Sequence, residues 1–548
     1  MTDGSQLDPG VDVVHGVWDD RSWWSTSNMG EAVPGVLTPL NWTFWSDSSE
    51  HALRRAFASF GALETSQVEV PQQPQLRIMG VFHGRLAAKV SFLGAMGDRL
   101  PGTSGAAVAE QILGTLPDDF VSHPSLRRLP HIAARLPGIA LRAPGNVRRL
   151  TADTGQWWSK AVHRQLTLEG ARKQFSECLA RFDDCMTAHI QCVFAAVQPL
   201  YDQVQRLADS VGDPALADQV LTGQGMHAEL DMVNDIWEMS RGRLELTAFL
   251  DRHGYHGPNE GEISSRVWRE DPEPLARIVG SYAAQPESES PASIVSLRIQ
   301  QRREAEHELL GRLTAARRAA ATVVLRLAAR NVPLRGVGKV AYLQVLDVAR
   351  ASARQIGAEL ERKNVIGSAD DVSFLTAHEL LTVSTPLHAA VTARRAKHDE
   401  HLSVMLPRSW FGRPEVTIGS TAGADRRGLV IRGIGACAGV VEGRARVVLD
   451  PTFEDVDSGE ILIAPFTDPS WASVMFTSAA LVVDIGGVLS HAAVVARELG
   501  VPCVMGTGDG SRRVRTGDWC RIDGHAGTLE ILRPADAART AESRSSGP

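Results

Sequence analysis

Apolar residues recur at helical spacing along much of the chain up to Met405, most clearly over residues 51–60, 165–250, 294–330 and 338–362. Apolar positions three and four residues apart form one face of an amphipathic helix. Beyond Met405 the pattern changes to short apolar runs separated by glycines, which is typical of strands. The pattern therefore predicts a multidomain α+β protein: a mostly helical region followed by a smaller domain in which short strands and helices alternate.

Proline, glycine and serine clusters divide this pattern into parts. Residues 284–293 combine prolines with alternating glutamates and serines, the composition of a flexible connector. A second cluster lies at 414–428, where helical periodicity ends. We therefore expect, in chain order, an N-terminal tail (1–20), a mostly helical region (21–413) with a flexible connector near 284–293, a linker (414–428), a C-terminal domain (429–534) and a disordered tail (535–548).

Residues 121–152 contain no acidic side chain but several arginines and prolines. One interpretation is a basic lining for an anionic substrate. The other is a solvated connector broken by its prolines. We favour the connector, because the arginines have no single-face spacing: they are Arg127, Arg128, Arg135, Arg142, Arg148 and Arg149.

The most informative stretch runs from Leu481 to Pro502. An apolar run is followed by two glycines, then His491, then a helical pattern that ends at Gly500. Ser490 is a good N-cap, so His491 should lie in the first helical turn, where free amide groups and the helix dipole favour an anion. A histidine at a helix start is by itself usually just an exposed side chain. In this setting it is also suited to carry a phosphate.

The stretch resembles the signature of the phosphohistidine-bearing swivelling domain of PEP-utilising enzymes. The matching residues are Gly486, Gly487, Ser490, His491, Ala492, Ala493, Ala496, Arg497, Gly500, Val501 and Pro502. The resemblance implies a C-terminal β/β/α swivelling domain in which His491 is catalytic and Gly487, Ser490 and Ala492 stabilise the phosphate. Arg497 lies about 240° around the helix from His491, at roughly 100° per residue, so we expect it to hold the helix to its domain.

Two stretches of the helical region resemble rifampin phosphotransferases. The first contains Asn28, Gly30, Glu31, Pro34, Thr38, Pro39 and Trp42; the second contains Gly254, Gly257, Pro258, Glu260 and Trp268. In the second, Tyr255 and His256 stand where the family more often has His-Arg. The resemblance implies a bulky, largely apolar hydroxyl compound as substrate, bound by Asn28, Glu31, Trp42, Tyr255, His256 and Glu260. The alternative is that the aromatic loop only packs.

Composition excludes several other functions. A net charge of −7 argues against nucleic-acid binding, and we expect no membrane contact, because the sequence has no long apolar run; a cytoplasmic location follows. Cys178, Cys185 and Cys192 recur every seven residues, about 10 Å apart along a helix. That spacing favours core packing over a shared metal ion. The pair His253 and His256 is weak evidence for a metal, so we expect no metal site.

In rifampin phosphotransferases an ATP-grasp domain charges the histidine. We recognise no such module and no Walker A sequence here, since Gly338-Lys339 lacks the surrounding motif. We therefore expect no cofactor bound by this chain, and a separate ATP-grasp or PEP-synthase-like partner that uses ATP or PEP with Mg²⁺. The expected function is phosphoryl transfer through His491 to a small-molecule hydroxyl. The alternatives are a catalytically degenerate binding or sequestering protein, or a regulatory phosphoacceptor.

Overall fold

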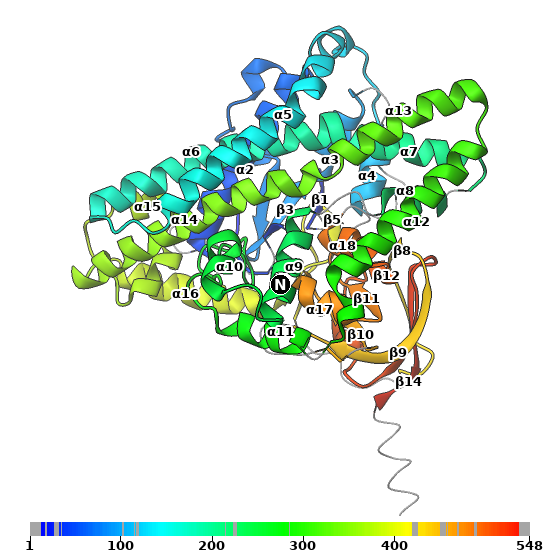
Figure 1. The fold of residues 1–548 in the computed structure, drawn as a ribbon. Helices are drawn as coiled ribbons and strands as arrows, with labels where there is room; N and C mark the ends of the chain where they lie inside the picture. The colour runs from blue at the N-terminus through cyan, green and yellow to red at the C-terminus, as the bar shows by residue number, and fades with distance from the viewer. Residues whose placement is uncertain are drawn as a thin grey trace, which may run out of the picture. The chain divides into compact units, whose positions relative to one another are not determined.

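The computed structural model describes most of the chain, and its helices and strands confirm the α+β fold class (Figure 1). The described residues are 12–16, 19–26, 32–33, 35–100, 104–113, 116, 120–213, 215–222, 227–283, 285–418, 426–449, 456–457, 459–467, 471–486 and 490–535. They form two compact units. The first unit comprises Met1–Ala195, Asn259–Ser265 and Gly338–Gly419, and the second comprises Ala196–Pro258, Arg266–Val337 and Ser420–Pro548. The mostly helical region is thus divided between both units.

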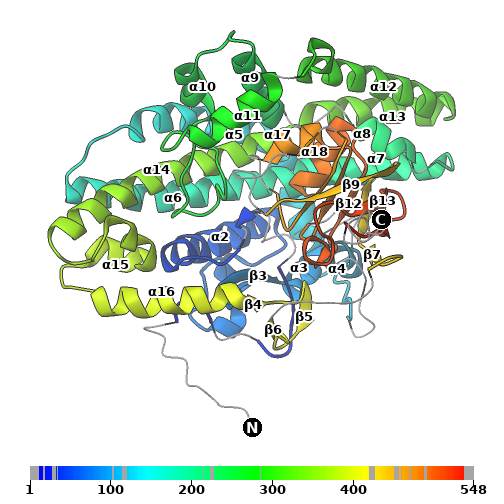
Figure 2. The same ribbon diagram turned by 90° about the horizontal axis from the view of Figure 1, so that it is seen from below.

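Long helices build the first unit: α2 (Pro39–Phe60), α5 (Leu129–Ala161), α6 (Leu168–Cys192) and most of α14 (Leu334–Arg362). These helices lie side by side in both ribbon views (Figures 1 and 2). Helix α2 begins at the N-cap Thr38, which accepts a hydrogen bond from the Asn41 amide, and it ends at Gly61 in the left-handed conformation (φ 85°). Phe44 packs edge-on against Phe182, and Trp158 on α5 donates to Asp347 on α14 at 2.8 Å.

A small antiparallel sheet completes the first unit, with strand order β2-β3-β1-β5. Trp24 and Trp410 both pack edge-on against Phe82, so part of the tryptophan-rich N-terminal segment is core. The remaining elements are β1 (Trp23–Ser25), η1 (Thr65–Gln67), η2 (Pro74–Leu76), β2 (Met79–Phe82), β3 (Arg85–Lys89), α3 (Val90–Gly97), α4 (Gly105–Leu113), η5 (Ala369–Phe374), α15 (Ala377–Thr382), α16 (His388–Ser403), β4 (Val404–Met405), β5 (Ser409–Phe411) and β6 (Thr417–Ile418).

The second unit joins a set of helices to the C-terminal domain. Its helical part follows the π-helix η3 (Val193–Val197), which the chain forms directly after α6. The helices are α7 (Gln198–Ser210), α8 (Ala215–Leu221), α9 (His227–Ser240), α10 (Leu246–His253), α11 (Glu273–Ala283), η4 (Glu287–Glu289), α12 (Pro291–Gly311) and α13 (Ala315–Asn331).

The C-terminal domain contains an eight-stranded sheet of order β7-β14-β13-β9-β10-β11-β12-β8. The central strands β9 to β12 are parallel, and every residue of β10 and β11 is buried, as expected for a sheet covered on both faces. The elements are β7 (Val430–Arg432), β8 (Ile434–Cys437), β9 (Val440–Val447), β10 (Ile461–Ala464), α17 (Ala472–Thr477), β11 (Ala480–Val483), α18 (His491–Leu499), β12 (Cys503–Met505), α19 (Gly510–Arg513), β13 (Trp519–Asp523) and β14 (Thr528–Arg533).

Two sequence-based predictions of helix extent were wrong. Residues 129–152, interpreted as part of a connector, belong to α5, which continues through Pro137 and Pro144. Burial of an apolar stripe that includes Ile132, Val147 and Trp158 compensates for the local cost of the prolines. The single helix expected over 294–330 is two helices, because Thr314 is the N-cap of a new helix, α13.

Candidate functional site

The helix that carries His491 begins as the sequence predicts. Ser490 is the N-cap of α18, and its side chain accepts a hydrogen bond from the Ala493 amide at 3.1 Å. His491 is the first helical residue, Ala492 is buried, and Gly500 ends the helix in the left-handed conformation (φ 66°). Residues 487–489, including Gly487, and the side chain of His491 lie outside the described part of the structure. The described backbone therefore gives the first turn of α18 the amide groups that favour an anion.

Asp484 holds the start of the glycine turn that precedes this helix. The residue follows β11, is buried, and accepts hydrogen bonds from the Thr507 hydroxyl at 2.6 Å and the Ser511 amide at 3.2 Å. Burial raises the pKa of the Asp484 carboxyl, and these hydrogen bonds oppose the rise. Gly486, two residues on, has φ 133°, which L-residues rarely adopt. Asp484 and Gly486 together fix the direction in which the chain leaves β11.

Arg497 connects α18 to the sheet, as predicted. Its guanidinium Nε donates to the Ala436 carbonyl at 2.9 Å, and the residue is buried. A second arginine was not anticipated. Arg298 on α12 donates from Nη2 to the Leu499 carbonyl at 2.8 Å. Arg298 thus holds the C-terminal end of α18, and Arg497 ties the same helix to the strand that contains Ala436.

Part of the second family-like stretch, residues 259–265, lies in the first unit and contacts α2. Glu262 accepts from the Thr38 hydroxyl at 2.8 Å, and the Trp45 indole donates to the Gly261 carbonyl at 3.1 Å. Residues 259–265 thereby cover the start of α2, the helix that carries half-buried Trp42. Burial raises the pKa of Glu262.

Glu260 is buried beside basic side chains of α14. A carboxylate oxygen of Glu260 lies 3.3 Å from Lys339 Nζ, and Arg350 donates to the Glu260 and Glu262 carbonyls at 3.0 and 3.1 Å. These contacts explain why this segment keeps its place in the first unit. The contact with Lys339 engages the carboxylate that the sequence interpretation assigned to a substrate.

Tyr255 and His256 are buried in the second unit. Their rings lie 4.2 Å apart, and the His256 carbonyl accepts from the Trp268 amide at 2.8 Å. Nearby, His253 Nε2 lies 2.8 Å from Asp235, and burial lowers the pKa of His253 to about 4. The predicted substrate residues thus divide between two units, with Trp42 and Glu260 in the first. Asn28 and Glu31 lie outside the described residues.

Within the described residues, no group of three or more His, Cys, Asp or Glu side chains is placed to hold a metal ion. Cys178, Cys185 and Cys192 are buried, which confirms core packing, and burial raises the pKa of the last two thiols to about 11. In the part of the chain searched, no helix is both long enough and apolar enough to span a bilayer.

Comparison with protein-family models gives two matches. Residues 456–527 match the mobile domain of PEP-utilising enzymes. Residues 200–336 match the fourth domain of rifampicin phosphotransferase. The first match contains the start of α18, and the second covers the helical part of the second unit.

Individual relatives give the same result. The chain is 30% identical over 301 residues to rifampicin phosphotransferase of Streptomyces sviceus, covering 54% of this chain and 35% of the relative. It is 31% identical over 283 residues to an uncharacterised protein of Mycobacterium tuberculosis, covering 52% of this chain and 30% of the relative. It is also 38% identical over 118 residues to phosphoenolpyruvate synthase of Aeropyrum pernix, covering 21% and 14%. The chain thus spans about a third or less of the length of these relatives. Its predicted resemblance to rifampicin phosphotransferases and to the mobile domain of PEP-utilising enzymes is confirmed.

Proposed function

We propose that the chain is a phosphotransferase component in which His491 is transiently phosphorylated and passes the phosphoryl group to a hydroxyl of a small molecule. The observation that carries this proposal is the position of His491 as the first residue of α18, after the N-cap Ser490. The amides and dipole of that turn stabilise the added negative charge. The match to the PEP-utilising mobile domain supports the same chemistry.

The reaction divides one phosphoryl transfer into two displacements. In the first, an imidazole nitrogen of His491 attacks the donor phosphorus, a P–N bond forms, and the P–O bond to the donor breaks. In the second, the acceptor hydroxyl oxygen attacks, the P–N bond breaks, and the hydroxyl proton leaves to a base. Both steps depend on positioning and charge stabilisation more than on covalent chemistry by the protein.

The phosphoryl donor in this proposal is ATP or PEP with Mg²⁺, handled by a separate ATP-grasp or PEP-synthase-like protein. The chain itself is then a carrier and acceptor component. The resemblance to rifampicin phosphotransferase and phosphoenolpyruvate synthase supports this class of donor.

The test is a labelling experiment on the full chain with a candidate ATP-grasp partner and ATP labelled in both its β- and γ-phosphoryl groups, or a PEP-synthase-like partner and labelled PEP. We expect an acid-labile label on the chain that His491→Ala abolishes. His525→Ala is the matched control, because His525 is an exposed histidine in the same domain. A label that persists in His491→Ala contradicts the assignment. A label that no hydroxyl compound removes favours the regulatory phosphoacceptor instead.

A further inference from the structure

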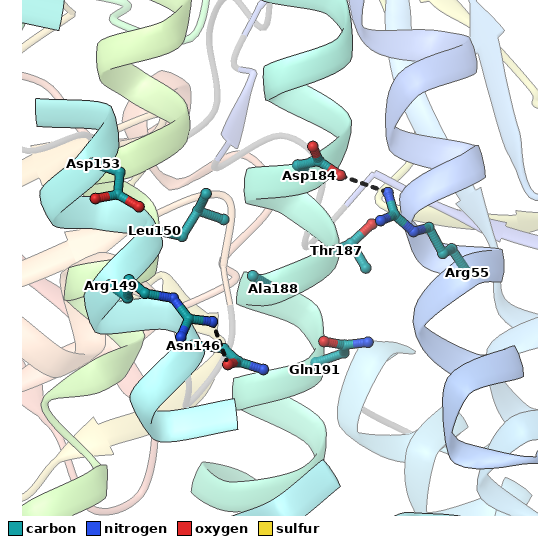
Figure 3. A pocket seen from close by; sticks show the side chains of 9 residues that line it. All are labelled: Arg55, Asn146, Arg149, Leu150, Asp153, Asp184, Thr187, Ala188 and Gln191. Atoms are coloured by element: carbon teal, nitrogen blue, oxygen red, sulfur yellow. Dashed lines mark hydrogen bonds and ion pairs between the residues drawn. The ribbon is translucent and has the colours of Figure 1, made fainter. Parts of the chain in front are cut away.

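A polar pocket lies between three helices of the first unit. Its volume is about 260 Å³. Helix α5 and helix α6 each line it with residues spaced i, i+3, i+4 and i+7, and α2 contributes one side chain (Figure 3). The lining residues are Asn146, Arg149, Leu150 and Asp153 from α5, Asp184, Thr187, Ala188 and Gln191 from α6, and Arg55 from α2.

The composition of these two stripes is unusual for packed helices. Residues at this spacing on neighbouring helices normally provide apolar contacts. Only Leu150 and Ala188 are apolar here. The adjoining contact between the same helices is buried, with Thr154 next to Cys185 at 3.7 Å. The two helices therefore pack against each other at the buried contact, and the polar residues of the pocket lie beside it.

Polar groups in the pocket keep unused hydrogen-bonding capacity. Thr187 is 5% exposed, and within the described residues its hydroxyl has no hydrogen-bond partner. Asp153 is exposed, and no described group pairs with its carboxylate. An unpartnered buried hydroxyl costs free energy unless a ligand or water satisfies it. The pocket thus offers a ligand two groups: the buried hydroxyl of Thr187 and the exposed carboxylate of Asp153.

The charges of the pocket restrict the ligand. Arg55 is already neutralised, since its Nη1 lies 2.7 Å from Asp183 and 2.8 Å from Asp184. Arg149 donates to Asn146 at 3.0 Å, as Figure 3 shows, and the lining as a whole carries two arginines and two aspartates, so its formal charges sum to zero. The lining therefore has no net positive charge that would select an anion. The amides of Asn146 and Gln191 can each donate and accept, which suits hydroxyl groups.

We propose that this pocket binds a small polyhydroxylated molecule without net negative charge, such as a sugar or an amino sugar. The volume lies a little below the roughly 300–1,000 Å³ of pockets that hold drug-sized ligands, so the ligand is small. Asp153 accepts from a hydroxyl or an ammonium group, and Thr187 and Gln191 contact hydroxyls from the α6 side. This site lies in the first unit alone and does not depend on phosphorylation of His491.

The test is saturation-transfer NMR on the full chain with D-glucosamine, methyl α-D-glucoside and D-glucose 6-phosphate. We expect transfer to the first two sugars and weaker binding of the phosphate. Asp153→Asn should weaken glucosamine binding about tenfold, the effect of losing a charged hydrogen bond, and Thr187→Val should weaken the binding of glucosamine and of the glucoside about fivefold, because it removes the buried hydroxyl. Asp153 is exposed and the Thr187 hydroxyl has no described partner to lose, so the fold should survive both changes. Arg142→Gln, exposed on the same helix but outside the pocket, is the control and should bind as the unaltered chain does.

Two results overturn the proposal. One is the absence of transfer to glucosamine and to the glucoside, or transfer that neither pocket variant weakens. The other is tighter binding of glucose 6-phosphate than of glucosamine, which reverses the ligand class. Neither result bears on His491, because the labelling experiment has its own readout.

Discussion

Arg298 caps the helix that begins with His491: its Nη2 donates to the carbonyl of Leu499, the last residue of α18, at 2.8 Å. The carbonyls of the last helical turn have no partner within the helix and form the negative end of its dipole, so a guanidinium there is doubly favourable. Gly500 leaves the space for this contact, since a Cβ at that position would lie 1.5 Å from Arg298 Nη2. A residue of α12 thus stabilises the opposite end of the helix from the one that holds His491.

Replacing Arg298 should loosen α18. Arg298→Ala removes a charge-assisted hydrogen bond worth about 1–2 kcal/mol. Amide hydrogen exchange of residues 490–500 should therefore become about tenfold faster or more. Arg303→Ala, on an exposed position of the same helix, should leave these rates unchanged. Equal protection of α18 in both variants would show that the Arg298 contact carries no stability.

The N-cap Ser490 should stabilise the N-terminal end of α18. Ser490→Ala removes the hydrogen bond to the Ala493 amide and should cost about 1 kcal/mol of stability. It should also lower the yield of phosphorylated His491, because the first turn that stabilises the phosphate frays. Chemical denaturation and the labelling assay measure the two effects. Ser490→Asp restores a capping oxygen but adds a negative charge next to the phosphate. If this variant recovers stability but not the label, the loss of label comes from charge repulsion and not from the missing cap.

Asp484 gives a pH-dependent prediction. Burial raises its pKa in the folded state above the ordinary 3.8, so the folded protein binds this proton more tightly than the unfolded chain does. The contribution of Asp484 to stability therefore falls as pH rises from about 4 through the raised pKa. Asp484→Asn cannot titrate. The free energy of unfolding of the unaltered chain should fall relative to that of the variant over this range, as urea denaturation at several pH values would measure. A constant difference would contradict the raised pKa.

Gly261 is a steric requirement of the first unit. A Cβ there would lie 2.0 Å from the Ala32 carbonyl oxygen, closer than any tolerated contact. Gly261→Ala should displace residues 259–265 from the start of α2 and lower the melting temperature by several degrees. Gly280→Ala is the control: it lies in α11 with open space around its Cβ position, and it should raise stability slightly, by about 0.5–1 kcal/mol. Equal melting temperatures for Gly261→Ala and the unaltered chain would refute this role.

The features predicted correctly from sequence are those that local chemistry determines. Ser490 and Gly500 bound α18 because a capping hydroxyl and a left-handed glycine act within one turn. Short apolar runs separated by glycines correctly predicted strands in the region of β8 and β9. The rotation of Arg497 around the helix predicted that it holds α18 to its domain, and its hydrogen bond to the Ala436 carbonyl agrees.

The features that were missed depend on contacts distant in sequence. Helix α5 persists through Pro144 because Val147 and Trp158 are buried against neighbouring helices, which no local propensity reveals. Arg298 lies about two hundred residues before its partner Leu499. The polar pocket was invisible for the same reason: the i, i+7 stripe from Asn146 to Asp153 becomes a site only when α6 presents a matching stripe. Asp484 could have been noticed in the sequence, because it is a single carboxylate at the end of an apolar strand. Nothing in the sequence indicated its partners Thr507 and Ser511.

The interleaved order of the two units restricts how the chain can be synthesised and dissected. Each unit is assembled from three separate segments, and the first needs residues as far as Gly419. The ribosome therefore has to deliver most of the polypeptide before either unit has its full set of segments. A cut at one of the crossings, such as Ala195 to Ala196, separates parts of a unit rather than releasing one. A truncation that ends before Gly338 would therefore remove segments of both units at once, whereas one that ends at Gly419 would remove a segment of the second unit only.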